Sequence, residues 1–162
     1  ADPVDGQGQS QDAATRALDN ESALSSVVSR PDSETEYFGG RARLIAYPSH
    51  ADHRGVLLPF QFDQMPFLPC RAFTVSSVPA GVGRGGHAHR SGMQMLVCLQ
   101  GRIEILMRYR QEEAAFILEP SSFALVLEAG VWCQQRYLAE GTSLLVFASE
   151  PYDPDSYLDH WT

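Results

Sequence analysis

The sequence of 162 residues contains no lysine: all 12 of its basic residues are arginine. Chemistry that needs a Schiff base on a lysine side chain is therefore excluded. Cysteine is scarce too, with three residues and no Cys-x-x-Cys spacing, so neither a zinc ribbon nor a disulfide framework is indicated. No apolar stretch approaches the roughly 20 residues that a membrane-spanning helix needs. We expect a soluble protein of the reducing cytoplasm.

The negative charge of the chain is concentrated at its two ends. The net charge is −8, from 20 acidic and 12 basic residues. Residues 1–40 hold eight acidic residues against two Arg (net −6) and residues 151–162 hold three against none (net −3), which leaves 41–150 with nine against ten (net +1). This balance predicts neither nucleic acid nor an anionic membrane as a partner. The Arg-only body remains compatible with a small anionic ligand, because a guanidinium binds phosphate through two hydrogen bonds.

The pattern divides the chain into a polar N-terminal extension, residues 1–40, and a β-rich domain, residues 41–162. Gln, Ser, Asp, Glu and Ala dominate the extension, a composition typical of a linker. In the domain, short runs with β-branched and aromatic residues alternate with turn residues about every eight to twelve positions. Ten such strands predict an all-β jelly-roll barrel. They are Arg43–Tyr47, Val56–Phe62, Arg71–Val78, Gly85–Arg90, Met93–Leu99, Arg102–Tyr109, Ala114–Leu118, Phe123–Leu127, Cys133–Tyr137 and Ser143–Ser149.

The densest chemistry lies in the glycine-rich run of residues 79–90. This run contains a literal GxGxxG, but no helical pattern follows it, so a dinucleotide-binding βαβ unit is set aside. Side chains alternate along a strand, which places His87 and His89 on one face, about 7 Å apart. Two imidazoles that point into one barrel interior form either a metal site or an acid–base apparatus.

The spacing around the two histidines resembles the first cupin motif. It reads Gly81-x5-His87-x-His89-x4-Gln94-x6-Gly, with Gln94 where metal cupins usually have Glu. The second cupin motif has its counterpart at residues 128–133, where Cys133 stands in place of the usual ligand His. Both changes weaken a metal centre, because they remove an anionic ligand and an imidazole. We expect neither a metal nor another cofactor.

A longer set of residues resembles one cupin family, the nucleotide-sugar 3,4-ketoisomerases. The Arg-Gly-x-His-Ala-His element and the terminal Tyr-Asp-x-x-x-Tyr stretch are its most specific parts. This WxcM-like group of RmlC-type cupins acts on dTDP-4-keto-6-deoxyglucose, and its likeness implies a cupin barrel, or double-stranded β-helix. The matching segments are Asp52–Leu57, Pro66–Phe67, Arg71–Phe73, Val78–Gly81, Arg84–His89, Gln94, Val131–Trp132 and Leu144–Tyr157.

The resemblance also implies a reaction. A His removes the C3 proton beside the C4 ketone, an enediol forms, and a proton returns at C4 without a metal. Carried over by position, His89 is the implied base, and His87 is a second acid–base group or a substrate donor. Arg71 and Arg84 are implied to hold the sugar or its diphosphate, because a guanidinium fork suits phosphate oxygens.

Two further residues are candidates for substrate binding. Gln94 belongs to the first motif, and Trp132 can stack on a nucleobase or fill the core. The implied partners are a dTDP-sugar and a second copy of the chain, since the family pairs its barrels through exchanged edge strands.

Four positions depart from the family pattern near the expected pocket. Gln61, Cys70, Thr74 and Cys133 stand where the family often has an acidic residue, Lys, Tyr and His, respectively. These changes remove possible donors or proton relays. Three alternatives therefore stay open: a catalytically silent sugar-nucleotide-binding cupin, a 3,5-epimerase-type sugar cupin and a metal-dependent cupin oxygenase.

Overall fold

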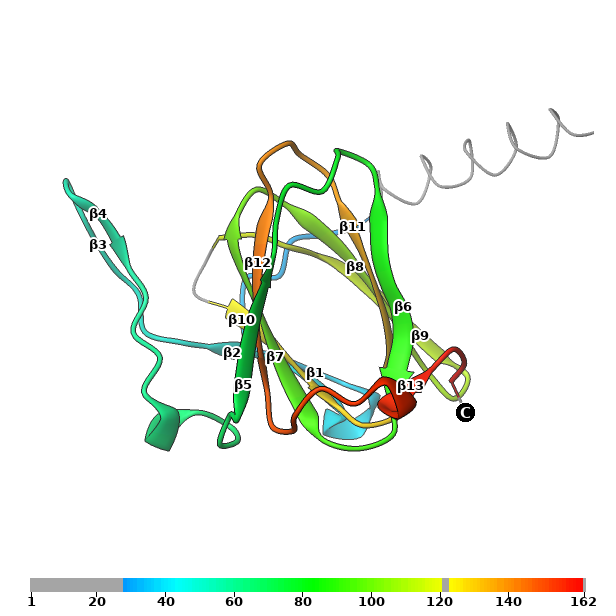
Figure 1. The fold of residues 1–162 in the computed structure, drawn as a ribbon. Coiled ribbons are helices and arrows are strands. Elements are labelled where there is room, and N and C mark those ends of the chain that lie inside the picture. Colours follow the sequence, from blue (N-terminus) through cyan, green and yellow to red (C-terminus); the bar gives the residue numbers. More distant parts are fainter. Residues whose placement is uncertain (1–27, 121–122, 162) are drawn as a thin grey trace, which may run out of the picture.

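The computed structural model describes residues 28–120 and 123–161, and nearly all of its regular elements are strands (Figure 1). The predicted all-β class is thus confirmed. Most of the polar extension predicted for residues 1–40 lies outside the described residues. Within the described ranges, none of the helical segments has the length and hydrophobicity that crossing a membrane requires. The three helical pieces are short 3-10 turns: η1 (Phe38–Gly40), η2 (Phe62–Gln64) and η3 (Pro154–Ser156).

Two antiparallel sheets face each other and enclose the core (Figure 1). The first has the order β1-β2-β10-β7-β12-β5 and the second the order β13-β6-β11-β8-β9. This is the predicted double-sheet barrel. Its strands are β1 (Thr35–Tyr37), β2 (Ala42–Ala46), β5 (Arg71–Val75), β6 (Gly83–His89), β7 (Met93–Gln100), β8 (Ile103–Tyr109), β9 (Glu112–Leu118), β10 (Phe123–Glu128), β11 (Trp132–Tyr137), β12 (Ser143–Ala148) and β13 (Tyr157–Leu158).

The central strand β7 is buried on both faces. Leu96 and Cys98 belong to the cluster inside the barrel. Met95 and Val97 belong to a second cluster on the outer face of the six-stranded sheet, which the segment around Phe60 covers. A strand without a solvent face needs no polar alternation. That is why residues 95–99 form a continuous apolar run.

The predicted strand Val56–Phe62 is wrong over most of its length. Only β4 (Gly55–Leu57) is a strand, and it pairs with β3 (His50–Asp52) in a separate hairpin. Pro59 has no backbone N–H to donate to a sheet, so the chain leaves the extended conformation and turns into η2.

The sequence pattern did not predict two very short strands, β1 and β13. β1 lies inside the range assigned to the polar extension; it pairs with β2, and its Tyr37 stacks on Phe116, with ring centroids 5.6 Å apart. β13 has only two residues and exists through its pairing with β6. Tertiary contacts rather than periodicity determine both strands.

Candidate active site

Strand β6 carries His87 and His89 with their side chains on the interior face of the barrel. His87 pairs across the sheet with Cys133, which belongs to the interior cluster. Directly paired residues share a face of a sheet. Ala88 therefore points to the opposite face, as the strand period requires. The two imidazole rings lie 5.3 Å apart, centroid to centroid, with an interplanar angle of 82°.

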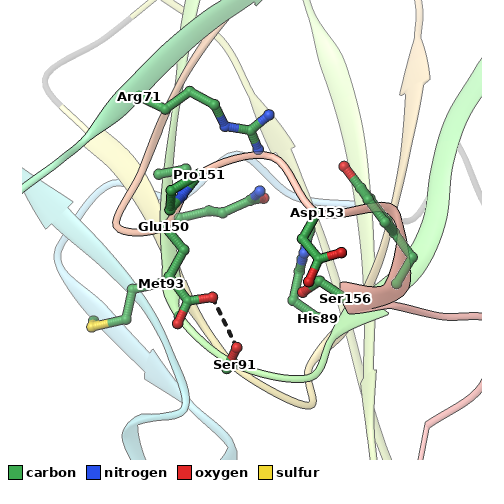
Figure 2. A pocket seen from close by; sticks show the side chains of 12 residues that line it. Arg71, His89, Ser91, Met93, Glu150, Pro151, Asp153 and Ser156 are labelled. Atoms are coloured by element: carbon green, nitrogen blue, oxygen red, sulfur yellow. Dashed lines mark hydrogen bonds between the residues drawn. The ribbon is translucent and has the colours of Figure 1, made fainter.

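Arg71 and Gln94 face the same interior from the opposite sheet. Ala148 on β12 pairs with Arg71 on β5 and with Gln94 on β7, so the three residues form one row across the sheet. Arg71, Gln94 and His89 line one pocket that is open to solvent. Figure 2 shows the Arg71 guanidinium on one side of this pocket and Ser91 with the Glu150 carboxylate on another.

The Arg71 side chain is unusual in having no acidic partner. It is half-buried, and its Nε atom is buried with no hydrogen-bond acceptor. None of the ion pairs among residues 28–120 and 123–161 includes it. Its guanidinium instead packs over the rings of Phe73, at 4.9 Å, and Tyr152, at 5.5 Å. A buried donor without an acceptor is costly, so the site is suited to an anionic or carbonyl oxygen supplied by a ligand.

Both histidines are held in their uncharged form. Burial lowers the pKa of His89 to about 4; repulsion from His87 when that ring is protonated and the positive charge of Arg71 lower it further, and Glu150 opposes them. Burial also lowers the pKa of His87, while a backbone hydrogen bond at Gly85 and the carboxylate of Asp159 act in the opposite direction. Removal of water disfavours the imidazolium ion. At neutral pH both rings can therefore accept a proton.

Comparison with known proteins identifies the family. The family model described as WxcM-like, C-terminal, matches residues 41–162. The chain belongs to this WxcM-like family. A TDP-4-oxo-6-deoxy-alpha-D-glucose-3,4-oxoisomerase from Aneurinibacillus thermoaerophilus is 25% identical over 117 residues, which cover 72% of this chain and 84% of that protein.

Solved structures of sugar-modifying enzymes have the same fold. The sugar 3,4-ketoisomerase QdtA from Thermoanaerobacterium thermosaccharolyticum, in complex with TDP, superposes with a TM-score of 0.71 at 32% identity, covering 75% of this chain and 89% of that one. A mutant of QdtA was also solved with TDP-4-keto-6-deoxyglucose. The RmlC epimerase of Mycobacterium tuberculosis, at 17% identity and a TM-score of 0.66 over 77% of this chain and 71% of that one, shares the fold alone.

Three of the four departures from the WxcM-like pattern lie away from the two imidazoles. Gln61 lines a pocket on the outer face of the six-stranded sheet. Cys70 is exposed. Thr74 is exposed and pairs with Leu145, which packs on the outer cluster, so Phe73 and Val75 are the residues of β5 that face the interior.

Cys133 is the departure that changes the interior. It is buried beside His87, and burial raises the pKa of its thiol to about 12. A protonated thiol is neither a nucleophile nor a good metal ligand. Among residues 28–120 and 123–161, no group of three or more His, Cys, Asp or Glu side chains is arranged to hold a metal ion.

The structure does not bring Trp132 or Arg84 to this pocket. Trp132 precedes the interior residue Cys133, so strand alternation turns its ring to the outer face, where it contacts Arg108. It is left out of the proposed site. Arg84 is exposed and lies five residues before His89 on β6, beyond the point where the pairing with β11 shifts register.

The pocket also contains residues that sequence reasoning missed. Glu150 follows β12 and accepts a hydrogen bond from the Ser91 hydroxyl at 2.8 Å. Tyr157 lines the pocket from the C-terminal segment. Both belong to the stretch 144–157 that carries the family resemblance. The resemblance marks this stretch as important, but it does not indicate that Glu150 and Tyr157 lie beside the histidines.

Replacing Arg71 with Met should raise the pKa of His89, because the substitution removes a nearby positive charge and keeps a long side chain. We expect His89 to titrate above about 4 but below 6.5, since burial and His87 still act. NMR titration of the histidine ring signals measures this shift. Arg102→Met, which removes a charge at an exposed position, is the matched control. An Arg71→Met protein with an unchanged His89 titration would contradict the placement of the guanidinium beside His89.

Proposed function

We propose that the protein is a nucleotide-sugar 3,4-ketoisomerase that converts TDP-4-keto-6-deoxyglucose, or a closely related 4-keto sugar, into its 3-keto isomer. The observation that carries the proposal is the meeting of two uncharged imidazoles, 5.3 Å apart, with a guanidinium that has no acidic partner: His89 and Arg71 line one pocket, and His87 lies beside His89. The first supplies bases and the second a site for developing negative charge. Membership of the WxcM-like family and the activities named for the relatives support the same reaction.

His89 is the base in this proposal. Its ring accepts the C3 proton, the electrons of the C–H bond form a C3=C4 double bond, and the C4 carbonyl oxygen becomes an enediolate oxygen. The C3 hydroxyl proton then passes through His87 to the oxygen at C4, and the electrons of the C3=C4 bond take up a proton at C4 from the protonated His89 ring, whose proton exchanges with solvent. C3 ends as a ketone and C4 as an alcohol, so the sugar is oxidised at one carbon and reduced at the next without a cofactor.

Arg71 supports this step in two ways. Its guanidinium donates to the enediolate oxygen, whose charge develops during proton removal. The positive charge of Arg71 lowers the pKa of His89, and a negative charge bound by Arg71 offsets this effect. His89 therefore becomes a stronger base when substrate is present. Gln94 is a neutral donor in the same row. Arg84, farther along β6, is assigned to the diphosphate end of the substrate.

Turnover in heavy water tests the proposed reaction. Incubation of the purified protein with TDP-4-keto-6-deoxyglucose should place deuterium at C3 of recovered substrate and at C4 of a 3-keto product, as read by NMR. His89→Asn should lower the exchange rate about 10²–10⁴-fold, the effect of losing a general base, while TDP binding by calorimetry persists.

Each alternative gives a different result in that experiment. Binding of TDP without exchange would leave a silent binding cupin and overturn the proposal. Exchange at C3 and C5 with the C4 ketone retained would indicate a 3,5-epimerase. Stoichiometric iron or manganese in elemental analysis, with turnover that depends on it, would indicate an oxygenase.

A homodimer is also part of the proposal, and the β3–β4 hairpin supports it. The hairpin stands away from the barrel (Figure 1) and pairs with no other described strand. Its side chains include Val56 and Leu57, which are 67% and 64% exposed. A two-stranded hairpin is marginally stable alone in water. Contact with a second copy would bury these apolar side chains. The cytoplasmic location stays a prediction.

Replacing both Val56 and Leu57 with Asp should therefore produce a monomer, because two charges would have to be buried on association. Light scattering after size exclusion should give about twice the chain mass of 17.9 kDa for the unmodified protein and the single mass for the variant. Val82→Asp, at a residue 42% exposed outside the hairpin, should leave the mass unchanged. An unmodified protein that elutes as a monomer would rule out this part of the proposal.

A further inference from the structure

The chain ends in a segment that crosses the edge of β6 beside the two histidines. We define residues 153–161 as the C-terminal strap. It contains η3 and the two-residue strand β13, whose Tyr157 and Leu158 pair with His89 and Ala88. Arg90 secures the strap near its start, since its backbone N–H donates to the Ser156 carbonyl at 2.8 Å and its Nε to the Asp155 carbonyl at 2.9 Å.

Tyr157 places an aromatic ring against both imidazoles. Its centroid lies 4.6 Å from that of His87, at an interplanar angle of 78°, and 4.9 Å from that of His89, at 51°. Because the imidazoles themselves are 5.3 Å apart, the three rings form a compact triangle. An imidazole has freedom about two side-chain torsions, and packing on a neighbouring ring restricts both. Tyr157 thus limits how the bases can rotate in the pocket.

The hydrogen bonds from Arg90 and the pairing of β13 hold the strap only as far as Leu158, and its far end has a separate anchor. The Trp161 ring lies on the outer face of the five-stranded sheet, 5.4 Å from the Trp132 ring. The Arg108 guanidinium lies 4.7 Å from the Trp161 centroid and 5.1 Å from the Trp132 centroid. An ion pair to Glu113, 2.6 Å from Arg108 Nε, fixes that guanidinium. Cation–π contacts of this kind stabilise a docked aromatic residue.

We propose that Tyr157 and Trp161 are positioning residues of this site: Trp161 anchors the C-terminal strap on Arg108 and Trp132, and the anchored strap holds Tyr157 against His87 and His89. Neither residue needs to touch the reacting atoms. The proposal also assigns Trp132 a structural role on the outer face, as one side of the anchor. It rests on the proposed ketoisomerase function only for its kinetic readout.

The strap should affect titration as well as turnover. The charged or titratable groups that face the two histidines come from four elements besides β6. They are Arg71 from β5, Cys133 from β11, Glu150 after β12, and Tyr157 and Asp159 from the strap itself. When the strap detaches, water reaches both imidazoles and the Asp159 carboxylate moves away from His87. Contact with water raises the pKa of each ring more than the loss of Asp159 lowers that of His87, because burial is the largest cause of both lowered pKa values.

Trp161→Ala and Trp161→Phe form the first test. We expect Trp161→Ala to raise the pKa of His89 from about 4 toward 6.5 in an NMR titration and to lower kcat roughly tenfold or more through misplaced bases. Trp161→Phe keeps a ring over Arg108 and should restore both values. Leu99→Ala removes an apolar side chain of similar exposure, 38% against 37%, at the far end of β7 and should change neither.

Tyr157→Phe and Tyr157→Ala separate packing from hydroxyl chemistry. If the Tyr157 ring acts by position alone, the kcat of Tyr157→Phe should stay within a few-fold of that of the unmodified protein. The kcat of Tyr157→Ala should fall as far as that of Trp161→Ala. A Tyr157→Phe variant as defective as Tyr157→Ala would overturn the positioning role, because the hydroxyl would then be what matters. A Trp161→Ala variant with the unmodified histidine titration would overturn the anchor.

The histidine titration needs no substrate, so the inference can be judged apart from the reaction. If the unmodified protein shows no exchange of the sugar proton, the proposed function fails while the titration of Trp161→Ala still tests the strap. If exchange occurs and the histidine pKa values of Trp161→Ala equal those of the unmodified protein, the proposed role of the strap is wrong while the proposed function stands.

Discussion

Strand β6 turns His87 and His89 into the barrel, and the resulting loss of water governs the behaviour of the whole site. Burial favours the uncharged imidazole, which is the form that can accept a proton at neutral pH. The neighbouring groups adjust this balance. Arg71 and the second histidine lower the pKa of His89 further, while Glu150 raises it. Both imidazoles are therefore uncharged before any ligand enters the pocket.

The same arrangement couples substrate binding to base strength. The Arg71 guanidinium has a buried Nε without an acceptor, so the pocket is electrostatically incomplete until a ligand oxygen arrives. An anion in that position cancels the positive charge that weakens His89 as a base. Binding and proton removal then depend on one side chain. The contacts of the Arg71 guanidinium with the rings of Phe73 and Tyr152 restrict its position without neutralising its charge.

Much of the barrel and part of the site could be predicted from sequence. The alternation rule placed His87 and His89 on one face, and the family likeness brought in Arg71 and Gln94, all of which the structure gathers inside the barrel. Where the structure differs from what the sequence indicated about the site, the difference has a physical reason. Trp132 was a candidate for stacking on a nucleobase, and the structure places its ring on the outer face, because its neighbour Cys133 on the same strand faces the interior. Tyr157 and Trp161 act through contacts between segments far apart in sequence, which no local period encodes.

The central claim is that an uncharged, buried His89 removes the sugar proton, and its most direct test is the pH dependence of that step. The rate of C3 proton exchange, measured as kcat/KM between about pH 4 and pH 8, reports the free protein's base. We predict a flat profile from pH 8 down to about pH 5, with the rate falling only as the pH approaches the His89 pKa of about 4. A fall centred near pH 6.5, the ordinary value for an exposed imidazole, would contradict the account.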